Sequence, residues 1–250
     1  MKIEGVAIGT LVAQYAGFFM AIALWMHHYR PLRKYAGLRS LTDRQAMYRF
    51  FQVNRDIFFR TLCLVAVTVF FTSAGAAQGE VVLAVNTLLM QLFTLFSYFM
   101  DGFAYAGEAL AGKHIGANDR QALRQMTRQL FLWGIGLSTV FTLLYGIGGE
   151  NFLHLLTNEP NVIAASSTYF YWVLAIPLAG FAAFLYDGIF IGATATGLML
   201  RAMSIAATAF FLIYFGCRET MGNHALWLAF ITYLALRGIV QGILGRKILV

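Results

Sequence analysis

Residues 99–110 read FMDGFAYAGEAL and place two carboxylates, Asp101 and Glu108, in an apolar run that begins near Val81. Such a run is long enough to cross the roughly 30 Å hydrocarbon core of a bilayer at about 1.5 Å per residue. A charged side chain at the centre of a membrane helix costs roughly 2.5–3.5 kcal/mol on insertion scales. The two acids therefore predict that one face of this helix meets water or other helices, because lipid cannot satisfy a carboxylate.

The composition of the whole chain indicates a membrane protein. Its 250 residues are 60% hydrophobic and only 12% charged, whereas soluble domains contain about 25% charged residues. The formal charge of +7 could suggest nucleic-acid binding, but the basic residues lie between the apolar blocks, where they set membrane topology. No nucleophile–base arrangement, phosphate-binding glycine loop or histidine cluster occurs in the sequence. We therefore expect no enzyme activity, no nucleic-acid partner and no metal site.

Seven apolar blocks are long enough to span the bilayer, so the predicted fold is an all-α polytopic membrane protein with seven transmembrane helices. Their predicted bounds are residues 5–26, 57–76, 81–111, 130–148, 163–193, 203–216 with its flanks, and 226–244. Lys and Arg gather after the first, third, fifth and seventh blocks, and segments 77–80 and 149–162 carry none. The positive-inside rule then predicts that the N-terminus lies outside and the C-terminus in the cytoplasm.

The segment 27–54 is too polar to span a membrane. Ser40 and Asp43, three residues apart, resemble a capping box, which is typical of a helix start. Apolar residues alternate with Arg44 and Arg49 after it. We expect a short amphipathic helix on the inner leaflet, with its arginines near anionic membrane lipid.

The polar residues of block 81–111 follow helical spacing. They recur at steps of three and four residues and fall within an arc of about 100° on one helix face, while the opposite face is apolar. The stripe comprises Gln91, Thr94, Tyr98, Asp101, Tyr105 and Glu108. We expect it to border a water-filled cavity or other helices.

A second intramembrane acid, Asp187, repeats the Asp-Gly pair of Asp101 in block 163–193. Pro177 and Gly180 precede it by one to three turns. A proline inside a span frees a carbonyl group and often bends the helix toward a cavity. Interrupted helices near binding sites are a recurring feature of transporters.

The residues alone leave several roles open for these polar groups. Each aspartate either has a structural role, bonding backbone or pairing with Arg60 or Arg201, or handles ion or substrate directly, or forms a gating contact. Glu108 is either a solvated or paired acid near the cytoplasm or part of the same site. Arg237 either snorkels or pairs with an inner-side acid. Asn86 lines a cavity or bonds a neighbouring helix.

Three runs give the sequence a family resemblance. They are LAVNTLL at 83–89, FMDGFAYAGEALAGKHIGA at 99–117 and YDGIFIGAT at 186–194. In composition and spacing they resemble the MATE (multidrug and toxic compound extrusion) family, and within it the DinF-type branch. The resemblance covers essentially the whole chain.

The resemblance implies an organisation for the chain. Family members have twelve spans in two six-helix lobes, with both termini cytoplasmic. Residues 1–26 resemble the last helix of an N-lobe, 27–54 a cytoplasmic amphipathic connector, and 55–250 a six-helix C-lobe. The chain is thus expected to be a partial one, with the other N-lobe helices as its partners, in a bacterial inner membrane.

The resemblance also implies a function and a site. Family members export cationic or amphipathic compounds by alternating access, driven by H⁺ or Na⁺. Here proton coupling is the expectation and sodium the alternative, because 58–72, the first C-lobe helix, lacks the acid of the sodium-coupled branch. No other cofactor is expected. The predicted substrate or ion cavity, or gate, comprises Asp101, Asp187, Gln91, Tyr98, Glu108, Asn86 and Tyr186.

Two alternatives to efflux stay open. One is a lipid-linked oligosaccharide flippase of the same superfamily, which basic cavity residues would favour, whereas the cavity candidates here are acidic or neutral. The other is a non-transporting seven-span membrane protein.

Overall fold

The computed structural model describes residues 3–28, 30 and 43–249, and it divides into two compact units, Met1–Gln52 and Val53–Val250. The described residues form eight α-helices. Seven of them are long and apolar enough to cross a membrane, which confirms the predicted all-α fold with seven spans. The helices are α1 (Ile3–His28), α2 (Arg44–Ala76), α3 (Glu80–Gly116), α4 (Arg120–Leu156), α5 (Pro160–Ser167), α6 (Phe170–Gly192), α7 (Thr196–Met221) and α8 (Asn223–Leu249).

The helix α2 begins earlier than the sequence analysis predicted. The expected short amphipathic helix and the second span are one continuous helix, because no glycine or proline lies between Arg44 and Ile57. Asp43 caps this helix, since its Oδ1 accepts a hydrogen bond from the backbone N–H of Gln45 at 2.9 Å. Ser40, the other member of the expected capping box, lies outside the described residues.

The fifth predicted span is also divided differently. The block 163–193 forms the short helix α5 and the long helix α6, which are separated at Thr168 and Tyr169. The N-terminal end of α6 is fixed by contacts with α8. The Tyr169 ring packs against His224 at 4.8 Å between centroids with the rings tilted by 44°, and Trp172 Nε1 donates to His224 Nδ1 at 3.1 Å. Pro177 lies buried inside α6 without ending the helix.

The helix α4 also runs beyond its predicted end at Gly148. It continues to Leu156 across a kink at Gly149, where φ is 32° and ψ is −118°. A glycine accommodates this left-handed φ without a Cβ clash.

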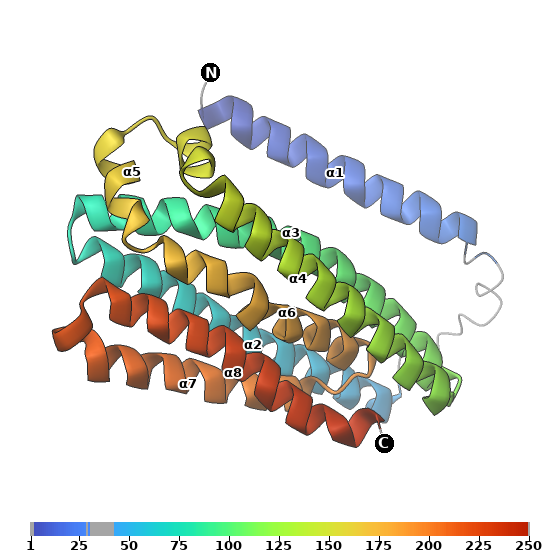
Figure 1. The fold of residues 1–250 in the computed structure, drawn as a ribbon. Helices are drawn as coiled ribbons and strands as arrows, with labels where there is room; N and C mark the ends of the chain where they lie inside the picture. The colour runs from blue at the N-terminus through green and yellow to red at the C-terminus, as the bar shows by residue number, and fades with distance from the viewer. Residues whose placement is uncertain (1–2, 29, 31–42, 250) are drawn as a thin grey trace. The chain divides into compact units, whose positions relative to one another are not determined.

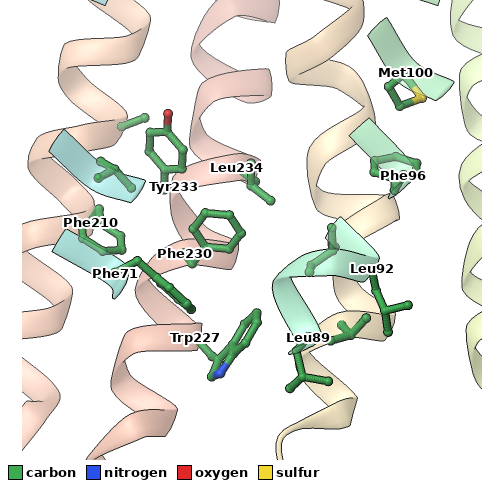
Figure 2. Packing of buried hydrophobic residues seen from close by; sticks show 14 of the residues in the cluster. Phe71, Leu89, Leu92, Phe96, Met100, Phe210, Trp227, Phe230, Tyr233 and Leu234 are labelled. Atoms are coloured by element: carbon green, nitrogen blue, oxygen red, sulfur yellow. The ribbon is translucent and has the colours of Figure 1, made fainter. Parts of the chain in front are cut away.

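In the second unit, α6 lies beside α3, α4 and α8, and α7 packs along α8 (Figure 1). Lipid is as apolar as these side chains, so close van der Waals packing stabilises such a bundle. Figure 2 shows Phe71 of α2 next to Trp227 and Phe230 of α8, with ring centroids 5.1 and 5.3 Å apart. The core continues along α3 through the buried residues Leu89, Leu92, Phe96 and Met100.

Two glycines bring α6 directly against α3. A Cβ atom on Gly188 would lie 2.0 Å from the carbonyl oxygen of Ala104, and one on Gly192 would lie 2.3 Å from that of Glu108. Only glycine fits at such a backbone contact. The contact holds the polar stripe of α3 at a fixed position relative to Asp187 of α6.

Candidate functional site

A cavity of about 350 Å³ lies between four helices of the second unit. Asp101, Asp187 and Glu108 line it together, so the two intramembrane aspartates share one hollow. Its lining residues are Arg60 and Leu64 of α2, Phe93, Ser97, Asp101, Ala104, Tyr105 and Glu108 of α3, Phe184, Asp187, Gly188 and Ile191 of α6, and Arg237 of α8.

Asp187 is fully engaged by neighbouring side chains. Gln241 Nε2 donates to its Oδ1 at 2.5 Å, and Arg237 Nη2 donates to its Oδ2 at 2.6 Å. Arg60 Nη2 also donates to Oδ2. The carboxylate is only 8% exposed, so these donors replace the water it has lost.

The helix α8 supplies two of these donors from one face. Arg237 and Gln241 are four residues apart and therefore lie one above the other on the helix surface. Gly238, next to Arg237, lets α8 approach α6, because a Cβ there would lie 2.9 Å from the Cβ of Ala182. The Arg237 guanidinium also lies over the rings of Phe184 and Tyr233, at 5.7 Å from each centroid.

Asp101 has a different environment from Asp187. It is half-buried, and no hydrogen bond or ion pair within the described part of the chain engages its carboxylate. It nevertheless lies within electrostatic reach of Asp187, Arg60 and Arg237. The structure therefore offers one paired and one open aspartate in the same cavity.

The other four predicted site residues lie outside this cavity. Asn86 is buried and exchanges two hydrogen bonds of 2.9 Å with Asn223 of α8, and its Oδ1 also accepts from Trp227 Nε1 at 2.9 Å. Of the two roles considered for Asn86, these contacts correspond to hydrogen bonding with a neighbouring helix, α8. Tyr98 is 70% exposed on α3.

Gln91 and Tyr186 also lie elsewhere. Gln91 lines a separate, more open depression near the N-terminal ends of α3 and α5 and the C-terminal end of α4, which also contains Glu80 and Glu159. Tyr186 packs on Phe131 of α4, with ring centroids 4.8 Å apart, and lies beside Gly242 of α8. The polar stripe of α3 therefore borders this cavity only along its C-terminal part.

The cavity candidates named from the sequence are acidic or neutral, whereas the cavity in the structure also contains two arginines. Arg60 and Arg237 both line it. Both were named as pairing partners for acids, and the structure pairs both with Asp187. Gln241 was missed, although its spacing of four from Arg237 was a signal. Among the described residues, no group of His, Cys, Asp and Glu is arranged to hold a metal ion.

Comparisons with known proteins agree with this architecture. The MatE family model matches residues 57–215. DNA damage-inducible protein F of Escherichia coli K12 is 34% identical over 99% of this chain and 54% of its own length. The probable multidrug resistance protein NorM of Chromobacterium violaceum is 23% identical over 86% of the chain and 48% of its own length.

A solved structure shows the same fold. The crystal structure of MATE in the bent conformation matches with a TM-score of 0.75 and 16% identity, over 91% of this chain and 51% of that one. The chain spans about half the length of the relatives it matches. The family is one of transporters and not of enzymes, as the sequence predicted. This multi-pass membrane protein, whose sequence and fold both match, therefore belongs to the MatE family.

Proposed function

We propose that this chain forms part of a secondary active transporter that exports cationic or amphipathic compounds from a bacterial cell by ion-coupled antiport. Its membership of the MatE family supports transport. The name of the NorM relative supports small-molecule substrates. In this proposal residues 55–250 are the C-lobe, 27–54 the connector and 1–26 a helix of the other lobe.

The observation that carries the proposal is the open carboxylate of Asp101 inside a membrane cavity. A carboxylate in such a place binds either a proton or a cationic group of a substrate, and binding of one excludes the other. This competition couples export of a cation to entry of a proton. Glu108, two turns further along α3, lines the same cavity and offers a second carboxylate toward the cytoplasm.

Asp187 has a different role in this proposal. Its two oxygens already accept hydrogen bonds from Arg237, Gln241 and Arg60. A proton or substrate could bind there only by displacing these donors. We therefore assign Asp187 the structural role and the exchangeable proton to Asp101.

The flippase alternative gains one supporting observation, since Arg60 and Arg237 are basic residues in the cavity. The three acids Asp101, Asp187 and Glu108 outnumber the two arginines, so the formal charge of the lining is two minus three, or −1. This balance favours cationic substrates. If the Asp101→Asn substitution leaves export of a cation unchanged, the flippase alternative is favoured instead.

The test uses the complete gene product reconstituted in proteoliposomes with a pH gradient. Asp101→Asn is expected to lower exchange of a lipophilic cation for protons by roughly 10- to 100-fold, because a hydrogen bond to a charged group contributes about 1.5–3 kcal/mol. Glu219→Gln, which removes an exposed acid of α7 away from the cavity, is the matched control. Unchanged exchange in Asp101→Asn would reject the proposal.

A further inference from the structure

The first two turns of α6 form a segment that is bounded by an interruption at each end. On one side, Thr168 and Tyr169 separate the segment from α5. On the other side lies Pro177, which has no backbone N–H and therefore leaves the carbonyl group of Val173 without its helical hydrogen bond. Helices commonly bend at such a position. Residues 170–176 are therefore the part of α6 that is best placed to move as a unit.

Two side-chain hydrogen bonds hold this segment to neighbouring helices within the described part of the chain. Thr142 Oγ1 of α4 donates to the carbonyl oxygen of Leu174 at 3.3 Å. Trp172 Nε1 donates to Nδ1 of His224, the second residue of α8, at 3.1 Å. Buried apolar side chains of the segment add packing contacts. The bond from Trp172 is thus the hydrogen bond that joins the segment to α8.

The bond between Trp172 and His224 requires one protonation state of the imidazole. An indole N–H can only donate, so Nδ1 of His224 accepts the hydrogen bond and carries no proton. An imidazolium carries a proton on both ring nitrogens and has no acceptor to offer. Histidine is the side chain that changes its charge between pH 5 and pH 8. Acidification therefore removes the acceptor on which this bond depends.

The surroundings of His224 can accommodate the charged ring. The side chain is partly exposed, and the Tyr169 ring lies 4.8 Å away, within reach of a cation–π contact. The described titratable and charged side chains at this end of the bundle (Figure 1) are Glu80, His154, Glu159, Tyr169, Tyr171, Arg218 and Glu219. The charged ones are exposed, so water screens them, and none has a hydrogen bond or ion pair with His224. The hydrogen bond from Trp172 is therefore the contact that protonation changes most.

We propose that the Trp172–His224 bond is a proton-sensitive latch, closed while the imidazole is neutral and open once it is charged. In the closed form, residues 170–176 stay on α8. In the open form, this segment moves about Pro177, while the part of α6 beyond the proline keeps the hydrogen bonds of Asp187. The latch makes the mobility of α6 respond to pH at the N-terminal ends of α6 and α8. This regulation goes beyond the proposed function and does not depend on it.

The test measures the mobility of nitroxide spin labels on the complete gene product in detergent micelles, in a background without Cys63 and Cys217. One label is attached at Tyr171→Cys inside the segment, and the matched control label at Leu178→Cys, just beyond Pro177. These side chains are 78% and 50% exposed, so a label disturbs little packing. From pH 8 to pH 5 the mobile fraction at position 171 should rise roughly 2- to 10-fold, as expected for the loss of one hydrogen bond. The mobile fraction at position 178 should stay unchanged.

Variants of the histidine separate the latch from general effects of acid. His224→Asn keeps a neutral acceptor at every pH, so the label at position 171 should stay immobile at pH 5. His224→Lys has donors only, so it should give the mobile state at pH 8 as well. His154→Gln removes an exposed histidine at the end of α4 and should leave the pH response unchanged.

Three outcomes would overturn the latch. The first is equal mobility at pH 8 and pH 5 with His224 in place, and the second is the same rise in His224→Asn as with His224. The third is an equal rise at position 178, because the whole of α6 would then loosen. If His224→Lys fails to fold, the comparison of His224 with His224→Asn decides the question. Since no transport is measured, failure of the latch leaves the proposed function intact, and failure of the proposed function leaves the latch intact.

Discussion

At the scale of single residues, the same Asp-Gly pair has two different environments in this molecule. Asp187 accepts hydrogen bonds from two arginines and a glutamine, whereas Asp101 has no bonded partner among the described residues. The difference arises from the helices opposite them, because α8 and α2 carry the donors that face α6. Asp187 is therefore suited to hold helices together, and Asp101 is suited to exchange an ion.

This distinction predicts that the two aspartates differ in how much they contribute to stability. Asp187→Asn should lower the free energy of unfolding by roughly 3–5 kcal/mol, because it leaves the buried guanidinium of Arg237 and the partly buried guanidinium of Arg60 without a carboxylate. Asp101→Asn should change it by less than about 1 kcal/mol, since it breaks no hydrogen bond or ion pair in the described structure. Denaturant unfolding of the purified complete gene product in detergent micelles measures both.

A double variant provides the control for this prediction. Adding Arg60→Gln to Asp187→Asn removes one of the two uncompensated charges, so it should recover part of the lost stability. Additive losses in the double variant would contradict a charge cluster. Equal stability of Asp187→Asn and the wild type would contradict the structural role of Asp187.

The sequence was sufficient to find the acids of the cavity but not to assign their roles. The three- and four-residue spacing on α3 predicts one polar face, yet that face divides between two hollows. Gln91 lies in the depression at the N-terminal end of α3, and Asp101 lies in the cavity that it shares with Asp187. Which hollow a residue reaches depends on the neighbouring helices, and helical periodicity carries no information about them. Arg237 was found because a charge inside a span requires a partner.

At the scale of elements, glycines on α6 determine how the cavity walls meet. Gly188 and Gly192 are one turn apart and touch the α3 backbone at Ala104 and Glu108. The small residues of this segment suggest close helix packing from the sequence alone. The sequence could not indicate that α3 is the partner, because a small-residue stripe fits any helix.

Gly192→Ala is therefore expected to separate α3 from α6. Its Cβ would lie 2.3 Å from a backbone carbonyl oxygen, which cannot move aside as a flexible side chain can. We expect a loss of roughly 1–3 kcal/mol of stability, together with weaker binding of a lipophilic cation. Thermal unfolding in detergent and a binding titration measure the two effects.

The matched control is Gly102→Ala in α3, where a Cβ would meet nothing within 4 Å. Alanine has a higher helix propensity than glycine, so this variant should be as stable as the wild type or up to about 1 kcal/mol more stable. Equal behaviour of the two variants would mean that the α3–α6 backbone contact is unimportant.

Helix ends were less predictable than helix existence. Hydropathy located all seven spans because each requires about 20 apolar residues. The break between α5 and α6 was not predicted, because neither Thr168 nor Tyr169 is a helix breaker. In addition, Tyr169 and Trp172 contact His224, which lies far away in the sequence. Pro177 was the expected interruption, yet α6 passes through it.

At the scale of the whole molecule, the orientation in the membrane follows from charges on the turns. The turn between α2 and α3 carries no Lys or Arg, whereas Lys113, Arg120 and Arg124 flank the turn between α3 and α4. The helix between them has 37 residues, about 55 Å at 1.5 Å per residue, so the two turns lie on opposite sides of a bilayer. We expect the basic turn in the cytoplasm.

Single cysteines test this orientation in a background without Cys63 and Cys217. Gln78→Cys in the α2–α3 turn should react with a membrane-impermeant maleimide in intact cells, and Gln121→Cys near the start of α4 should react only after permeabilisation. Both positions are exposed, so a difference between them reports the side of the membrane and not burial. The reverse labelling pattern would invert the orientation. The cavity of Asp101 and Glu108 would then lie toward the outer leaflet, and the proposal that Glu108 offers a carboxylate toward the cytoplasm would have to be abandoned.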